Sequence, residues 1–217
     1  MSIADLRREY ARARLDERDV SHDPLVEFAR WFAEYREVSP PEPNAMILAT
    51  ATADGVPSVR TVLLKIFDAE GFVFFTDYRS RKGQELEANP RAALLFYWGE
   101  LERQVRITGS VSRTSAEESE QYFRRRPVGS RLGAWSSHQS QLIAGRGVLE
   151  KALAEAEATF ADGEPPLPPY WGGFRVAPDT YEFWQGRPNR LHDRIVYLKP
   201  GADEQPGREW RIARLSP

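Results

Sequence analysis

The spacing of hydrophobic residues changes near residue 45. Residues 23–38 repeat apolar side chains every three or four positions, which predicts an amphipathic helix. The face expected to be buried carries Leu25, Phe28, Phe32 and Tyr35. Asp23 can cap this helix, and Pro24 suits its first turn. Beyond residue 45 apolar and polar residues alternate instead, which is the spacing of strands.

The alternating runs follow one another at hairpin spacing. Asp54-Gly55 and Glu70-Gly71 are typical of the turns between paired strands. The runs predict about nine strands, over residues 45–52, 56–67, 72–77, 91–98, 102–113, 173–176, 180–185, 194–199 and 209–215.

Further helices are predicted between these strands. One covers residues 81–89 after Ser80, one covers 116–126 after a capping box that Ser115 begins, and one lies around 149–160. Consecutive antiparallel strands with separate helices indicate an α+β fold, with a barrel and helices packed outside it. We expect one domain over 1–217.

The N-terminal segment, residues 1–20, is charged and lacks an apolar stripe. It precedes the first well-capped helix, so we expect it to add little to the core. We interpret it as a mobile segment that docks or closes as a lid.

Composition excludes several classes of function. The net charge is −2, so no overall positive field is available to hold nucleic acid. There are no cysteines, and His22, His138 and His192 share no metal-ligand spacing, so neither a disulfide nor a metal site is expected. No apolar run approaches the ~18 residues of a membrane span. These features suit a cytoplasmic protein.

Arg60 and Lys65 lie in the apolar run 56–67. Long cations in a half-buried strand reach either an anion or the rim, although an edge strand also uses such charges against aggregation. Strict alternation places these two residues on opposite faces. Either a bulge realigns them or they serve different parts of a site.

Arg81 and Lys82 begin the predicted helix at 81–89. Free backbone N–H groups at a helix start favour an anion, and two cations add to that attraction. The alternative is a solvated first turn. With Arg60, these residues predict a first phosphate site.

Tyr122, Arg126 and Ser130 are spaced four apart. Two hydroxyls and a guanidinium suit a phosphate, although arginines at a helix end also match the helix dipole. With Lys65 they predict a second phosphate site. Two phosphorylated molecules meeting in one cleft would be a cofactor and a substrate.

Three amide or hydroxyl residues add polar contacts. Gln139 and Ser140 could donate to a phosphate or to a ring carbonyl. Gln104 lies in a predicted strand, where it could read the edge of a heterocycle or form an ordinary cross-strand pair.

Residues 183–194, FWQGRPNRLHDR, combine aromatic and cationic side chains. Arg190 and His192 are two apart, so in an extended segment they share one face and could contact one ligand. Trp184 precedes them and Arg194 follows them in the sequence. A structural role for His192 is the alternative.

Taken together, these motifs resemble those of the pyridoxamine 5′-phosphate oxidase family. The resemblance runs nearly end to end, through LRREY, NAMILAT, RTVLLK, FFTDYRSRKG, ERQV, YFRRRPVGS, GAWSSHQS, WGGFRV, EFWQGRPNRLHDR and RLSP. One departure is Phe75, where many relatives have tyrosine. A main-chain contact there would survive this change, and a phenol hydrogen bond would not.

The resemblance implies an FMN-binding antiparallel split β-barrel that works as a homodimer, with FMN at the subunit interface. For FMN it implies contacts from Arg60, Val62, Leu63, Lys65, Phe75, Thr76, Arg81, Lys82, Gln104, Gln139, Ser140, Trp184 and Arg194. For the substrate it implies contacts from Arg7, Tyr10, Lys65, Tyr122, Arg126, Ser130, Arg190 and His192. The last two of these would also be catalytic.

The implied activity belongs to vitamin B6 metabolism. Pyridoxamine 5′-phosphate and pyridoxine 5′-phosphate would be oxidised to pyridoxal 5′-phosphate, with O2 reduced to H2O2. A carrier of flavin or pyridoxal phosphate, or a flavin reductase, could use the same barrel. The complete set of substrate residues favours the oxidase over both alternatives.

Overall fold

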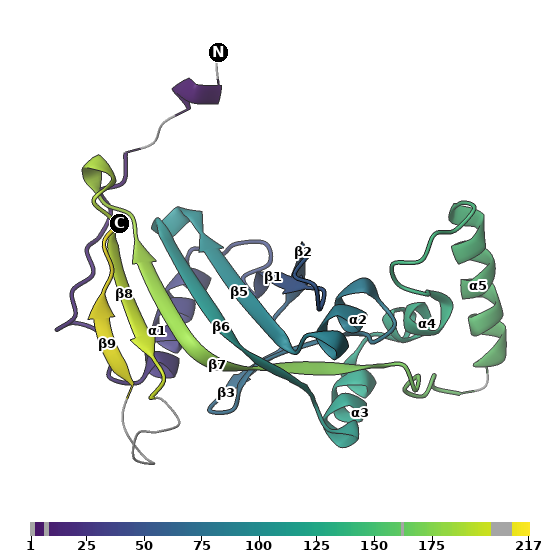
Figure 1. The fold of residues 1–217 in the computed structure, drawn as a ribbon. Coiled ribbons are helices and arrows are strands. Elements are labelled where there is room, and N and C mark those ends of the chain that lie inside the picture. The colour runs from purple at the N-terminus through teal and green to yellow at the C-terminus, as the bar shows by residue number, and fades with distance from the viewer. Residues whose placement is uncertain (1–2, 7–8, 162, 201–209) are drawn as a thin grey trace.

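The computed structural model describes residues 3–6, 9–161, 163–200 and 210–217. Its described strands form one curled antiparallel sheet (Figure 1). The path runs β2-β1-β5-β6-β7-β4-β3, β8 pairs with β7, and β9 pairs with β8. The strands are β1 Ala45–Ala51, β2 Pro57–Leu63, β3 Ile66–Asp68, β4 Gly71–Asp77, β5 Arg91–Trp98, β6 Arg103–Arg113, β7 Trp171–Gln185, β8 Asp193–Leu198 and β9 Arg211–Arg214. The α+β prediction with an antiparallel split barrel is therefore confirmed.

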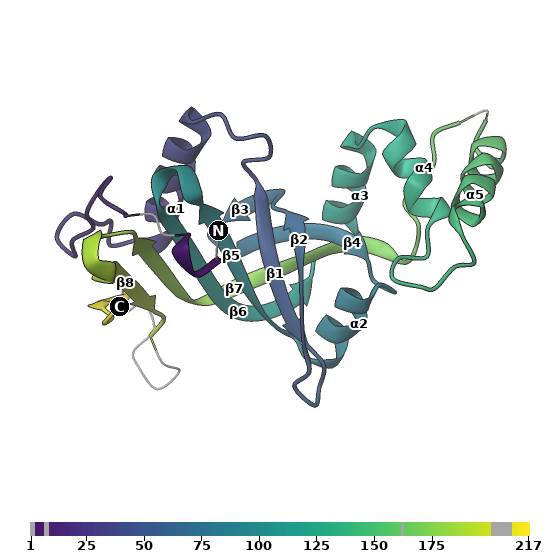
Figure 2. The ribbon, with the colours of Figure 1, turned by 90° about the horizontal axis from the view of Figure 1, so that it is seen from above.

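Five α-helices flank the sheet in the described chain, and α2 to α5 gather at one end of it (Figure 2). They are α1 Pro24–Glu37, α2 Arg81–Ala88, α3 Ala116–Arg125, α4 Val128–Ser136 and α5 Arg146–Thr159. The predicted caps are present: Asp23, Ser80 and Ser115 each accept a backbone N–H in the first turn of α1, α2 and α3. None of the helices in the described residues is long and apolar enough to cross a membrane.

Two predicted strand boundaries and one helix differ from expectation. The run 56–67 is divided into β2 and β3, whereas 173–176 and 180–185 are joined in β7. A bulge lies opposite Thr108 and Gly109, and it accommodates Pro178 within β7. Helix α4 was not predicted, because its two glycines and two serines disfavour a helix locally.

Aromatic side chains fill the space between α1 and the sheet. Phe28 lies 4.9 Å from Phe72 and 5.0 Å from Phe96 between ring centroids, and Trp31 lies 5.2 Å from Phe183. These edge-to-face contacts fix α1 across the sheet, so that the opposite end remains available for a ligand pocket.

The N-terminal segment contributes to the core, contrary to expectation. Leu15 is 6% exposed and Val20 is 9% exposed, and both belong to the main hydrophobic cluster. The expectation failed because two separate apolar residues form no stripe in the sequence, yet both meet the core.

Carboxylates hold the backbone of this segment against the body of the protein. Glu102 accepts hydrogen bonds from the N–H groups of Ala11 and Arg12, both at 3.0 Å, and Asp193 accepts one from Leu15 at 3.0 Å. If residues 1–20 act as a lid, as we expected, the lid is anchored to the body of the protein at residues 11–15.

We expect Leu15→Ala to lower the free energy of unfolding by about 2 kcal/mol, because it removes a buried side chain that the core cannot refill completely. Urea unfolding of full-length variants measures this loss. Leu6→Ala is the matched control, since Leu6 is 67% exposed. Equal unfolding midpoints for the two variants would contradict the anchoring.

Candidate functional site

A pocket of about 540 Å³ lies among β2, β4, α2, α3 and α4. Its lining includes eleven of the residues that the sequence analysis selected: Arg60, Val62, Leu63, Lys65, Phe75, Thr76, Lys82, Tyr122, Arg126, Ser130 and Gln139. We call it the anion pocket.

A break in the predicted strand brings Arg60 and Lys65 together. The N–H of Leu64 donates to Asn44 O at 2.8 Å, and the N–H of Lys65 donates to Val73 O at 2.9 Å. The chain thus leaves β2 after Leu63 and enters β3 at Ile66, and Lys65 lies in the break between the two strands. Strict alternation no longer applies across this break, and both cations line the same pocket.

The anion pocket is strongly cationic. Arg60, Lys65, Lys82, Arg125 and Arg126 line it, and no carboxylate lines it among the described residues. This local excess of positive charge stands in a chain of net charge −2. Such a pocket favours a multiply charged anion over a neutral ligand.

Arg126 is a cation of this pocket with a buried donor that is not satisfied by the protein. Its Nη1 is buried and has no hydrogen-bond partner in the described structure, and burial lowers the pKa of its guanidinium. The guanidinium carbon lies 4.6 Å from the ring centroid of Trp171. A buried donor without a partner costs free energy, so a bound anion would stabilise this arrangement.

The ring of Phe75 belongs to an aromatic stack in the wall of the anion pocket. Its ring centroid is 4.0 Å from that of Tyr122 and 5.5 Å from that of Trp171, with nearly parallel planes. The stack orients Tyr122 without requiring a phenol at position 75.

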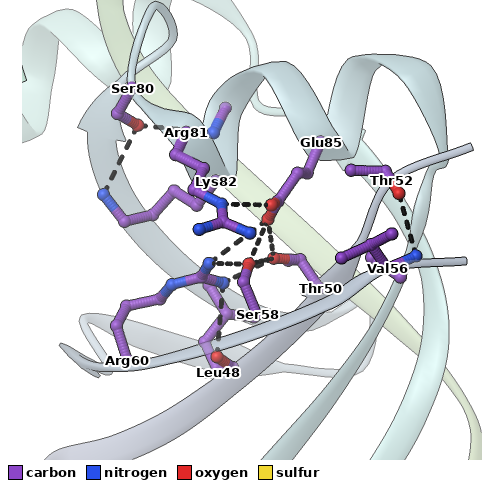
Figure 3. A network of polar contacts seen from close by, with 12 residues as sticks. Leu48, Thr50, Thr52, Val56, Ser58, Arg60, Ser80, Arg81, Lys82 and Glu85 are labelled. Atoms are coloured by element: carbon purple, nitrogen blue, oxygen red, sulfur yellow. Dashed lines mark hydrogen bonds and ion pairs between the residues drawn. The ribbon is translucent and has the colours of Figure 1, made fainter. Parts of the chain in front are cut away.

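Lys82 and Arg60 form the part of the wall nearest α2 (Figure 3). Lys82 Nζ donates to Gln139 Oε1 at 2.7 Å and to Thr76 Oγ1 at 3.0 Å. Burial, and then the positive charge of Arg60, lower the pKa of Lys82 to about 8. A bound anion would reverse this shift, because it would compensate both cations.

A second group of predicted residues lies where β6, β7 and β8 meet. Gln104 pairs with Trp184 and Trp184 pairs with Arg194, so the three form a row across the strands. Tyr10 lies edge-on to Trp184 and His192, with ring centroids 5.8 and 5.9 Å away. We call Tyr10, Gln104, Trp184, Arg190, His192 and Arg194 the Trp184 cluster.

His192 is held in one tautomer. The N–H of Arg187 donates to its Nδ1 at 3.1 Å, which places the hydrogen of the neutral ring on Nε2. Burial, and then the charge of Arg190, lower the pKa of His192 below its usual value. At neutral pH the ring is therefore uncharged, with Nε2 available as a donor.

The prediction that Arg190 lies in an extended segment is wrong. Pro188–Arg190 form a 3-10 turn, and Asn189 and Arg190 have φ of 56° and 61°. These left-handed residues follow Pro188 and turn the chain back into β8. The guanidinium of Arg190 remains close enough to lower the pKa of His192, although the two residues do not share the face of a strand.

The anion pocket and the Trp184 cluster lie at opposite ends of β7. Figure 1 shows this strand running from beside α3 to its pairing with β8. Trp171 lines the pocket and starts β7, whereas Trp184 lies near its end. Thirteen steps of ~3.3 Å separate them by roughly 40 Å along the strand. One subunit therefore does not bring all the predicted residues to one small ligand.

Three predicted residues lie outside both groups. Arg81 is 59% exposed and pairs with Glu85, and Ser140, with φ of 71°, lies in a neighbouring pocket beside α5. Arg7 lies outside the described residues.

Sequence reasoning missed Glu85, Arg125, Trp171 and Glu102. Glu85 could have been found, since it lies four residues after Arg81 on one helix. Arg125 could also have been found, since it directly precedes Arg126 in the sequence. Trp171 and Glu102 carry no such signal, because only the packed strands show which residues they meet.

Two family models match the chain. A family model described as "Pyridoxamine 5'-phosphate oxidase" matches residues 32–160. A second, "Pyridoxine 5'-phosphate oxidase C-terminal dimerisation region", matches residues 171–217.

Two relatives that align along nearly the whole chain are both pyridoxine/pyridoxamine 5′-phosphate oxidases. The chain is 57% identical over 216 residues to a pyridoxine/pyridoxamine 5′-phosphate oxidase of Burkholderia lata, covering 100% of this chain and 99% of that protein. It is 58% identical over 215 residues to one of Rubrobacter xylanophilus, covering 99% and 96%.

Two solved structures share the fold. The crystal structure of PhzG from Burkholderia lata 383, in complex with tetrahydrophenazine-1-carboxylic acid, has a TM-score of 0.83 and 33% identity, covering 94% of this chain and 98% of that one. A pyridoxamine 5′-phosphate oxidase-related, FMN-binding protein from Nostoc punctiforme has a TM-score of 0.66 and 19% identity, covering 91% and 100%.

Proposed function

The chain belongs to the pyridoxamine 5′-phosphate oxidase family, and on that premise we propose that it oxidises pyridoxamine 5′-phosphate and pyridoxine 5′-phosphate to pyridoxal 5′-phosphate. The observation that carries the proposal is the anion pocket, with five cations, no carboxylate among its described lining residues, and a buried Nη1 of Arg126 that has no hydrogen-bond partner in the described structure. Substrate and cofactor each carry a phosphate, which is the ligand that such a pocket favours.

The residues of the anion pocket fit FMN and substrate together. Arg60, Lys82, Thr76 and Gln139 would hold the FMN phosphate and ribityl chain, with Arg81 and Ser140 contributing from beside the pocket. Lys65, Tyr122, Arg126 and Ser130 would hold the substrate phosphate. Val62, Leu63 and Phe75 would contact FMN along the strands, and Lys65 would reach both ligands.

The Trp184 cluster would complete the site from a second copy of the chain. The roughly 40 Å along β7 keeps a subunit's own cluster away from its own pocket. A homodimer removes this conflict, and the match of residues 171–217 to a dimerisation region supports it. Trp184, Arg194 and Gln104 would then face the flavin, and Arg190, His192, Tyr10 and Arg7 would face the substrate.

Each proposed reaction removes two electrons from the substrate and reduces one O2 to H2O2. Pyridoxamine 5′-phosphate, H2O and O2 give pyridoxal 5′-phosphate, NH3 and H2O2. Pyridoxine 5′-phosphate and O2 give the aldehyde and H2O2. A bound FMN would supply the two-electron redox chemistry that links the loss of hydrogen at C4′ to the reduction of O2.

The protein would supply binding and orientation. Arg190 and His192 would hold the pyridine ring so that C4′ faces the flavin. His192 Nε2 would donate a hydrogen bond to the substrate, because its Nδ1 already accepts from Arg187. In this tautomer His192 orients the substrate and does not accept the proton that leaves the amine or alcohol group at C4′.

Colour gives the direct test. We expect the purified protein to be yellow, to bleach anaerobically with pyridoxamine 5′-phosphate, and to regain its colour in air. A flavin that binds but never bleaches would indicate a carrier, and bleaching by NADH alone would indicate a reductase.

The similarity to PhzG gives a second candidate, oxidation of a reduced phenazine carboxylic acid. The cations of the anion pocket could pair with a carboxylate as well as with a phosphate. Faster bleaching by tetrahydrophenazine-1-carboxylic acid than by pyridoxamine 5′-phosphate would favour this activity over our proposal.

Lys82 makes FMN binding dependent on pH. Its pKa is about 8 in the free protein, so affinity should fall about tenfold between pH 7 and pH 9 as the amine loses its proton. The FMN phosphate stays a dianion over this range, since its second pKa is about 6. Fluorescence titration measures the change, and Lys82→Met should bind weakly but without this slope. A flat wild-type profile would remove Lys82 from the phosphate site.

A further inference from the structure

Glu85 is a buried carboxylate beside the anion pocket that no proposed contact uses. Its side chain is 4% exposed and lies on α2, one turn beyond Lys82. Burial alone would raise its pKa, but hydrogen bonds from Ser58, Thr50, Arg81 and Arg60 together outweigh it and lower the pKa to about 2. It is therefore ionised at neutral pH.

Its two oxygens join three elements of the fold (Figure 3). Oε2 accepts from Thr50 on β1 and from Ser58 and Arg60 on β2, and Oε1 accepts from Arg81 Nε at 2.8 Å. Arg60 and Lys82 line the pocket from β2 and α2, respectively. The carboxylate thus connects the two elements that carry these cations.

The contacts of Arg60 show how this connection bears on a ligand. Nη1 donates to Thr50 Oγ1 at 2.5 Å and to Leu48 O at 3.3 Å, and Nη2 donates to Ser58 and to Glu85 at 3.2 Å. Within the described residues, Nε donates to no acceptor. The guanidinium is fixed through its two terminal nitrogens and keeps one donor for a ligand.

We propose that Glu85 is a positioning residue for the phosphate of the flavin, acting through Arg60. It fixes the guanidinium and ties α2, with Lys82, to the β1–β2 hairpin. A preorganised cation loses less freedom on binding than a mobile one does, so the phosphate gains more from the contact. This inference rests on the proposed FMN site.

The test compares FMN with riboflavin, which lacks the phosphate, by fluorescence titration of the full-length apoprotein. The dissociation constant of riboflavin divided by that of FMN measures how much the phosphate contributes to binding. We expect Glu85→Ala to reduce this ratio at least tenfold and Glu85→Gln to keep it within threefold of wild type, because glutamine retains an acceptor for Arg60. Glu87→Ala is the matched control, since Glu87 lies on the same helix and pairs with Arg113 at the surface.

A double-mutant cycle with Arg60→Ala distinguishes an effect of Glu85 on the position of Arg60 from a general loss of protein stability. Adding Glu85→Ala to Arg60→Ala should change the ratio little, because the residue through which Glu85 acts is gone. Equal weakening of both flavins, or a full additional loss in the double variant, would overturn the inference. A wild-type protein that binds both flavins equally would instead overturn the proposed FMN site.

Discussion

Arg126→Ala is expected to raise the Michaelis constant for pyridoxamine 5′-phosphate roughly 30- to 150-fold, corresponding to about 2–3 kcal/mol for a charge-assisted contact in a desolvated site. The reason is the buried Nη1 of Arg126, which has no hydrogen-bond partner among the described residues and lies beside Trp171. Steady-state kinetics at saturating O2 measure the effect, and flavin content should stay near that of the wild type.

Two controls make this result specific. Arg124→Ala removes a neighbouring arginine that pairs with Glu120 in solvent and does not line the pocket, so its kinetics should match the wild type. Pyridoxamine, which has no phosphate, should be a poor substrate for the wild type and should lose little more in Arg126→Ala. Equal losses with both substrates would mean that Arg126 does not bind the phosphate.

Arg190→Ala and His192→Ala are each expected to slow flavin reduction roughly 100-fold while FMN stays bound, because the pyridine ring loses its orientation. Both residues lie between β7 and β8, beyond the end of β7 that is far from the anion pocket, so the phosphate contacts should be unchanged. Anaerobic stopped-flow at saturating substrate isolates this step. His192→Gln should recover part of the rate, since its amide can donate as Nε2 does.

His22→Ala is the control for removing an imidazole, because His22 is exposed and lies outside the Trp184 cluster. Wild-type rates of flavin reduction in both Arg190→Ala and His192→Ala would contradict a role in orienting the substrate and would leave the two residues with a structural role.

Mixing subunits tests the shared site directly. A dimer of one Arg126→Ala and one His192→Ala subunit would contain one doubly altered site and one intact site. Random exchange should therefore restore about a quarter of the wild-type activity. No recovery after exchange would place the anion pocket and the Trp184 cluster in the same subunit.

Local elements and the types of side chain available for binding follow from short stretches of sequence. Helix α1 and the caps of α2 and α3 depend on neighbouring residues, so periodicity and capping residues predicted them correctly. The side chains suited to bind phosphate were also visible, because a cation in an apolar strand is unusual wherever the strand lies.

Which of these side chains meet depends on how the strands and helices pack. The break at Leu64 depends on hydrogen bonds to Asn44 and Val73, which belong to other segments, and it brings Arg60 and Lys65 into one pocket. The joining of two predicted strands into β7 places Trp184 far from that pocket. Periodicity reports the face on which a residue lies, whereas strand pairing is a non-local choice that many segments make together, so these distances could not be read from the sequence.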